Sequence, residues 1–118
     1  MSVEENKVLA QRFIDSANAM MGNPDNISSY IEEFFTPDFI LHLKTGDLNI
    51  QQFEALEHEL LNSHPNVRHS IVKLVSEEDM VVIQRKTSVV NQEFQAVDIC
   101  KVKDGKFVEM WVFSNRSE

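Results

Sequence analysis

The sequence is poor in the features that mark several large classes of protein. Its single cysteine, Cys100, excludes an internal disulfide framework and a cysteine-rich metal cluster. No apolar run approaches the roughly 18 residues that a bilayer-spanning helix needs. Lysine and arginine number 11 against 19 aspartates and glutamates, which gives a net charge of -8. Because the chain also lacks a basic cluster, we expect no nucleic acid and no membrane among its partners.

The chain has the length and composition of one globular domain. At 118 residues, with 42% hydrophobic and 25% charged residues, residues 1–118 are expected to form a single domain with a real core. The first residues, MSVEENK, are acidic and lack the basic and apolar regions of a signal peptide. We therefore expect a cytoplasmic protein.

The first half of the chain has helical periodicity. Apolar residues recur at helical spacing from Val3 to Met21, and Gly22-Asn23-Pro24 then ends this helix. Asn26 is a plausible N-cap of a second helix, which Thr36-Pro37-Asp38 breaks. Asn49 and Gln52 resemble a capping box that opens a third helix, which ends at His64-Pro65. In that helix we expect buried Phe53, Leu56 and Leu60, and mostly solvated Glu54, Glu57 and Glu59.

The second half has the period of two that is typical of strands. After a short strand-like run at residues 39–43, four strands are expected at about 67–75, 80–88, 93–102 and 107–114. Asp104-Gly105 favours a tight hairpin between the last two. Helices followed by a meander of strands indicate an α+β fold, in which three N-terminal helices cover a cone-shaped, curved antiparallel sheet. Such a cone encloses a pocket, where ligands bind.

Asp98 is the residue that does not fit its strand. Because strand side chains alternate, it shares a face with Ala96, Cys100 and Val102. A carboxylate on such a face must be paired, protonated or functional. In the structural interpretation it bonds to a neighbouring strand's hydroxyl or to a lysine. In the functional one it lines a pocket and exchanges protons as a general acid/base.

Other polar residues are weaker candidates. His42 alternates with Ile40 on the short strand; it either polarises a substrate carbonyl beside Asp98 or is a satisfied core or rim residue. Gln84 and Lys86 share a strand face with Met80 and Val82. That face either lines the pocket or is solvated. His58, His64 and His69 are expected to be exposed. Because no pair of histidines has metal-ligand spacing, we expect no metal and no cofactor.

Several strings of the sequence are similar to one known superfamily. HPNVRHSIVKLVSEEDMVVI and FQAVDICKVKDGKFVEMWVF resemble the strands of SnoaL-like polyketide cyclases, which belong with ketosteroid isomerase and nuclear transport factor two. FILH resembles the short strand before their third helix, and the resemblance covers nearly the whole chain. It implies the same cone-shaped α+β fold.

The resemblance also implies site residues. Asp98 falls on the position of the cyclases' acid/base, and Met110 and Val112 on the cavity lining, with Phe13 and Tyr30 closing the cavity from the helices. Two of these residues are among the places where the chain departs from its relatives. Phe13 stands where ketosteroid isomerase has a tyrosine, and Met110 where the cyclases have a histidine.

Two functions follow from these observations. The first is a pocket that binds an apolar, carbonyl-bearing molecule and moves a proton alpha to the carbonyl, in an aldol cyclisation or isomerisation, with Asp98 as acid/base and His42 assisting. The alternative is a ligand-binding or dimerisation module without catalysis. In either case we expect a homodimer through the outer sheet face, because that face carries apolar Val97, Ile99, Trp111 and Phe113.

Overall fold

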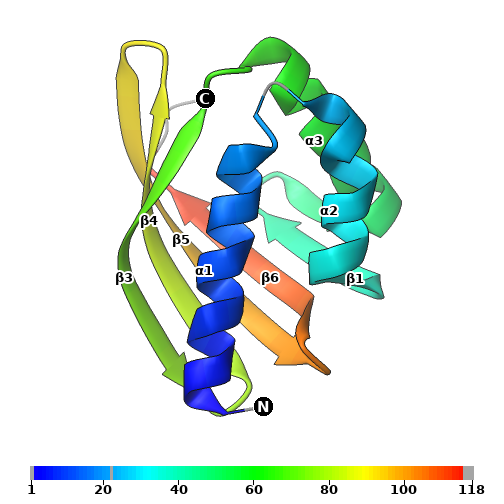
Figure 1. Cartoon of the computed structure of the whole chain (residues 1–118), viewed down its shortest axis with the longest axis vertical. Helices are drawn as coiled ribbons and strands as arrows, with labels where there is room; N and C mark the ends of the chain where they lie inside the picture. Colours follow the sequence, from blue (N-terminus) through cyan, green and yellow to red (C-terminus); the bar gives the residue numbers. More distant parts are fainter. Residues whose placement is uncertain (1, 22, 116–118) are drawn as a thin grey trace.

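Three α-helices cover one face of a six-stranded sheet (Figure 1). The structure is a computed structural model that describes residues 2–21 and 23–115; Gly22, part of the predicted end of the first helix, lies outside the described residues. The elements are, in chain order, α1 (Val3–Ala19), the 3-10 turn η1 (Pro24–Asn26), α2 (Ile27–Phe34), β1 (Phe35–Leu43), β2 (Gly46–Asn49), α3 (Ile50–Ser63), β3 (Arg68–Glu77), β4 (Met80–Val89), β5 (Gln92–Lys103) and β6 (Lys106–Ser114). The predicted α+β architecture is confirmed.

The two longer helices each begin at a capping box. The Ser2 hydroxyl accepts from the backbone N–H of Glu5 at the start of α1, and Asn49 accepts from that of Gln52 at the start of α3. In both boxes the glutamate or glutamine side chain accepts in return from the backbone N–H of the N-cap. The predicted capping box of α3 is therefore confirmed.

The buried side of α3 differs from the expectation. Phe53 and Leu61 are buried, whereas Leu60 is exposed. The buried stripe therefore runs through positions 53, 57 and 61, which lie one turn apart, rather than through 53, 56 and 60. As a consequence, Glu57 lies on the stripe that faces the sheet.

The sheet has the order β2-β1-β6-β5-β4-β3 and is mixed. All neighbouring strands are antiparallel except β1 and β6, which pair in parallel with His42 opposite Trp111. The expectation of a wholly antiparallel sheet is wrong in this one pairing. The strand predicted at 39–43 also begins earlier, at Phe35. It can include Pro37 because the β1–β6 register is interrupted between Phe35 and Ile40, so no hydrogen bond of the sheet requires an N–H at Pro37.

The hairpin turns are formed by residues in the left-handed region. Asp104 and Gly105 both have positive φ, 52° and 78°, which is the geometry of a type I′ turn. The turn predicted at this dipeptide is confirmed. It joins β5 to β6, and in their pairing Asp98 lies opposite Val112. In the pairing of β5 with β4, Asp98 lies opposite Ile83.

The sheet has an inner face, which the helices cover, and an outer face. Val81 and Ile83 of β4, and Ala96 and Cys100 of β5, point inward and are fully buried. The core between the inner face and the helices is rich in aromatic rings, of which Phe39 and Phe107 have no exposed surface. Figure 1 shows α1 lying across the β3–β4 side of the sheet and α2 with α3 over the β1 side.

Candidate functional site

Asp98 lies on the inner face in a closed ion pair with Arg85. Arg85 Nε donates to Asp98 Oδ2 at 2.7 Å, and Arg85 Nη2 donates to Oδ1 at 3.0 Å. Only 3% of the Asp98 side chain and 14% of the Arg85 side chain are exposed. Burial alone would lower the pKa of Arg85, but the charge and hydrogen bonds of Asp98 outweigh it and raise that pKa. The pair is therefore a two-point ion pair in which each Asp98 oxygen accepts one hydrogen bond.

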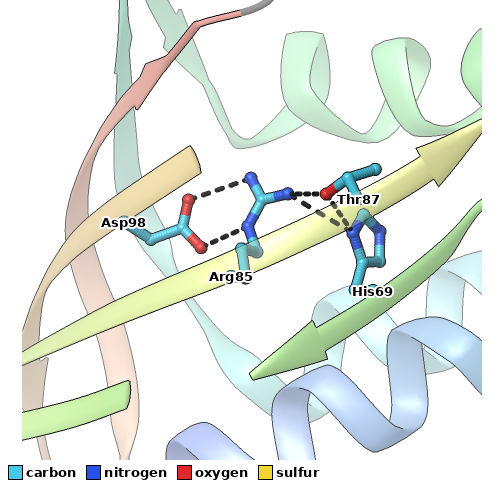
Figure 2. Close-up of polar contacts among 4 residues, drawn as sticks. All are labelled: His69, Arg85, Thr87 and Asp98. Atoms are coloured by element: carbon cyan, nitrogen blue, oxygen red, sulfur yellow. Dashed lines mark hydrogen bonds and ion pairs between the residues drawn. The ribbon is translucent and has the colours of Figure 1, made fainter. Parts of the chain in front are cut away.

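The second end of the Arg85 guanidinium bonds to two further inner-face residues (Figure 2). Nη1 donates to Thr87 Oγ1 at 2.7 Å and lies 3.3 Å from His69 Nδ1, while the hydroxyl and the imidazole are 2.9 Å apart. Because a guanidinium can only donate, His69 Nδ1 is an acceptor and the ring is neutral. Burial, with help from the Arg85 charge, lowers the pKa of His69 to about 4. The four side chains form one hydrogen-bonded chain from β5 across β4 to β3.

The first helix holds this chain in place. The side-chain amide of Asn18 donates to the backbone carbonyl of His69 at 2.7 Å, and its Oδ1 accepts from the His69 N–H at 2.8 Å. These two bonds fix α1 against the start of β3. His69, which we expected to be exposed, is partly buried for this reason.

Two polar residues face the chain from the other helices. Glu57 of α3 is partly buried on the Phe53–Leu61 stripe, and Tyr30 of α2 is buried. Burial raises the pKa of Glu57 to about 7, against a smaller lowering by Arg85. Burial also raises the pKa of Tyr30 well above its ordinary value, and the charges of Glu57 and Asp98 add to that shift. The expectation that Glu57 is solvated is therefore wrong.

Four of the other predicted pocket residues lie on this interior side. Phe13, Tyr30 and Met110 are buried in the core, and Val112, partly buried, stands opposite Asp98 in the β5–β6 register. The ring of Phe13 stacks on that of Tyr30 with centroids 5.8 Å apart. Asp98 thus lies on the face of the sheet that packs against this apolar core.

Gln84 and Lys86 do not lie on this side. They alternate with buried Ile83 and Thr87, so they point to the outer face, where Lys86 is exposed. Their predicted place in the pocket lining is corrected, and of the two interpretations of that face the solvated one agrees with the structure. The basic partner of Asp98 is Arg85, between them in sequence. Alternation places Arg85 on the same face as the apolar residues Val81 and Ile83, which could have indicated that it points inward. Met80 and Val82 make the other face of β4 equally apolar, so the pattern alone did not show which face is buried.

His42 also lies on the outer face, on the opposite side of the sheet from Asp98. Its Nδ1 is 2.7 Å from Asp47 Oδ1, its Nε2 is 2.6 Å from Glu109 Oε2, and its ring stacks on Trp111 at 5.1 Å. Hydrogen bonds to Glu109 and then to Asp47 raise the pKa of His42. The stabilisation from these pairs is present at low pH and lost as the pH rises through that raised pKa. The placement does not allow His42 to assist Asp98.

Two hollows in the surface of the described residues lie away from Asp98. One, of about 300 Å³, lies between the start of α1 and the β3–β4 turn and is lined by Asn6 and Asp79, among others. The second, of about 410 Å³, lies at the β4–β5 turn around Asn91. Within residues 2–21 and 23–115, no cluster of three histidine, cysteine or acidic side chains could hold a metal ion. No helix in the same ranges is long and apolar enough to cross a membrane.

The fold and the interior polar chain define a class of structure: a cone of α+β architecture whose polar groups gather between the sheet and the helices. Solved structures share this fold. The chain is similar to a proposed hydroxylase from Streptomyces galilaeus, with a TM-score of 0.79, 20% identity, and coverage of 97% of this chain and 91% of that one. It is also similar to a proposed SnoaL-like polyketide cyclase from a Jannaschia species, with a TM-score of 0.77, 21% identity, and coverage of 95% and 86%.

A third similar structure is a proposed ketosteroid isomerase from Kribbella flavida, with a TM-score of 0.78, 12% identity, and coverage of 98% and 82%. No protein-family model matches the sequence, and no curated protein matches it. The fold that these structures share is the cone-shaped fold of SnoaL-like cyclases and ketosteroid isomerases, and this chain has it. At these identities the likeness establishes the fold alone, so function has to be argued from the site.

Proposed function

We propose that this protein binds a small, apolar, carbonyl-bearing molecule between the inner face of its sheet and α2 and α3, without using Asp98 as a general acid/base. The observation that carries this proposal is the closed Asp98–Arg85 pair beside an apolar wall. Both carboxylate oxygens accept from the guanidinium, so a proton taken up by Asp98 would remove the charge that pairs with Arg85 in a buried site. Removing a partner from a buried pair costs about 3–5 kcal/mol, which a substrate would have to offset.

The lining supports an apolar ligand with one polar group. Phe13 and Met110 belong to the apolar core and Val112 packs against it, and few polar groups of that region are uncommitted. Tyr30 is one of them, because none of the side-chain hydrogen bonds found among the described residues involves its hydroxyl. A phenol that is kept protonated by burial donates well to a carbonyl oxygen.

The test is the binding of two matched probes, acetylnaphthalene and ethylnaphthalene, which differ in the carbonyl oxygen. We expect the ketone to shift the backbone amide resonances of inner-face residues Ile83 and Cys100. Replacing Tyr30 by phenylalanine should weaken ketone binding about fivefold, the equivalent of one hydrogen bond of about 1 kcal/mol, and leave the hydrocarbon unaffected. The outer-face variant Lys86→Gln is the matched control and should bind both probes as the wild type does.

Other outcomes would contradict the proposal. If neither probe bound to the wild type, or if the shifts clustered on outer-face residues such as Val82 and Ile99, the interior site would be lost. An equal loss of both probes in the Tyr30→Phe variant would show a packing defect instead of a hydrogen bond.

We also propose a homodimer through the outer face, in a cytoplasmic protein. In register across the sheet, Val75, Val82, Ile99 and Trp111 form an apolar row, and Phe113 beside it is 58% exposed. Side chains of this kind in a row favour a self-complementary interface. The row lies on the face that the helices leave uncovered.

Sedimentation equilibrium tests the dimer. The wild type should sediment as a dimer at micromolar concentration, and Phe113→Glu as a monomer, because a charge would be buried without a partner. Val90→Glu places the same charge at an exposed residue of the β4–β5 turn and should stay dimeric. A monomeric wild type, or equal behaviour of the two variants, would overturn this interface.

A further inference from the structure

We propose that Glu57 on α3 is the residue that, in its neutral form, donates a hydrogen bond to the ligand of the interior site. The inference rests on the proposed function, since it concerns the same site. Its ligand class is a neutral molecule that accepts a hydrogen bond, such as a ketone.

The helix places Glu57 toward the interior. Phe53 and Leu61, one turn before and one turn after it, are both buried members of the core. Residues at i and i+4 lie on the same side of a helix, so the Glu57 side chain points toward the sheet between these two core residues. The exposed residue Glu59 points elsewhere on the same helix.

Glu57 is uncommitted, in contrast to the four linked polar residues of β3, β4 and β5. Asp98, Arg85, Thr87 and His69 bond to one another. Among residues 2–21 and 23–115, the Glu57 carboxyl makes no hydrogen bond or ion pair. A partly buried carboxyl without a partner in the folded chain is free to bond to a ligand.

The groups around Glu57 leave it close to balance between its charged and neutral forms. Arg85 on β4 attracts its charge, but the Arg85 charge is already compensated by Asp98 on β5. On α2, Tyr30 is uncharged at neutral pH, because burial and then Glu57 raise its pKa. Burial therefore outweighs Arg85 and raises the pKa of Glu57 to about 7.

The remaining elements packed on α3 add no charge at this point. On β1 the inward-facing side chains are apolar Phe39 and Leu41. The acidic residue of β2, Asp47, bonds to His42 on the outer face, and that of η1, Asp25, is exposed. Glu54, on the same helix, bonds to the Ser28 hydroxyl at 3.4 Å. Within residues 2–21 and 23–115, Glu57 is thus a group of the interior whose pKa lies near 7.

A ketone would bind to the neutral form of Glu57. The protonated carboxyl donates a hydrogen bond to the carbonyl oxygen, whereas the carboxylate repels it and loses its own hydration. Binding then takes up a proton from solution. The affinity of the wild type should be constant below the pKa of about 7 and fall about tenfold for each pH unit above it.

The experiment measures acetylnaphthalene affinity between about pH 5 and about pH 9 for the wild type, Glu57→Gln and Glu59→Gln. Glutamine is a permanent neutral donor, so Glu57→Gln should bind equally well over the range. Glu59→Gln, at an exposed site of the same helix, should keep the wild-type pH profile. An unchanged profile in Glu57→Gln would overturn this inference and leave the proposed function standing. No ketone binding to the wild type at any pH would overturn the proposed function and this inference with it.

A measurement without ligand gives an independent check. The carbon-13 shift of the Glu57 carboxyl, assigned by its loss in Glu57→Gln, should titrate near 7 in the free protein. A raised folded-state pKa also means that the wild type loses stability relative to Glu57→Gln as the pH rises through about 7. A titration at the ordinary value of 4.5 would contradict the inference.

Discussion

Replacing Arg85 by methionine is expected to lower the free energy of unfolding by about 3–5 kcal/mol. The substitution leaves the Asp98 carboxylate, 3% exposed, without either of its guanidinium donors. An unpaired charge in such a site has lost its water and gains nothing in return. The Arg85→Met substitution also removes the guanidinium N–H from which the Thr87 hydroxyl accepts a hydrogen bond, and this lowers the free energy of unfolding further. Equilibrium denaturation in urea measures the change.

Two companion variants separate the charge from the packing. Arg85→Met combined with Asp98→Leu removes both charges and should recover most of the loss, because a buried pair replaced by apolar residues is often neutral. Lys86→Met, one residue further on the exposed outer face, should change stability by less than about 0.5 kcal/mol. An Arg85→Met loss below about 1 kcal/mol, or a double variant no better than the single one, would mean that Asp98 is not held as described.

Phe13→Ala is expected to cost a similar amount, about 3–5 kcal/mol. The Phe13 ring lies 5.1 Å from that of Phe107, 5.7 Å from Phe35 and 5.8 Å from Tyr30, measured between centroids. It joins α1 to α2, β1 and β6, so its removal leaves a cavity where four elements meet. The neighbouring elements cannot close that cavity without moving the sheet.

The control for this variant lies on the same helix. Val8 is exposed, and Val8→Ala should change stability by less than about 0.5 kcal/mol. Urea denaturation of both variants gives the comparison. If Phe13→Ala cost no more than Val8→Ala, the aromatic cluster would not be the centre of the core.

Much of the fold was predictable because local chemistry determines it. Asn49 and Gln52 form the capping box that their spacing indicated, and Asp104-Gly105 forms the hairpin turn. The parallel pairing of β1 with β6 was not predictable in this way. It joins strands that lie more than sixty residues apart, and no turn between them signals it.

The site was predictable only in part. The position of Asp98 on the buried face followed from alternation, and the structure places it there. The identity of its partner, Arg85, could not be predicted in the same way. Both faces of β4 carry apolar residues, such as Val81 and Val82, so alternation did not show which face of β4 is buried. On β1 the same ambiguity between Ile40 and Leu41 left the direction of His42 open.

Glu57 was missed for a different reason. Leucines at 56, 60 and 61 allow two phases for the buried stripe of α3, and the phase with Leu60 inside puts Glu57 in water. Contact with the sheet selects the other phase, with Leu61 buried. Only the packing of the helix could decide between them.

The most direct test of the central claim is the nitrogen-15 spectrum of the Arg85 side chain. If Arg85 holds Asp98 with a forked pair, its Nε–H should exchange slowly with solvent and its two Nη groups should give separate signals, because the bonds to Asp98 and Thr87 stop their rotation. Both features should disappear in Asp98→Asn. A wild-type Arg85 with a rapidly exchanging Nε–H and averaged Nη signals would contradict the account.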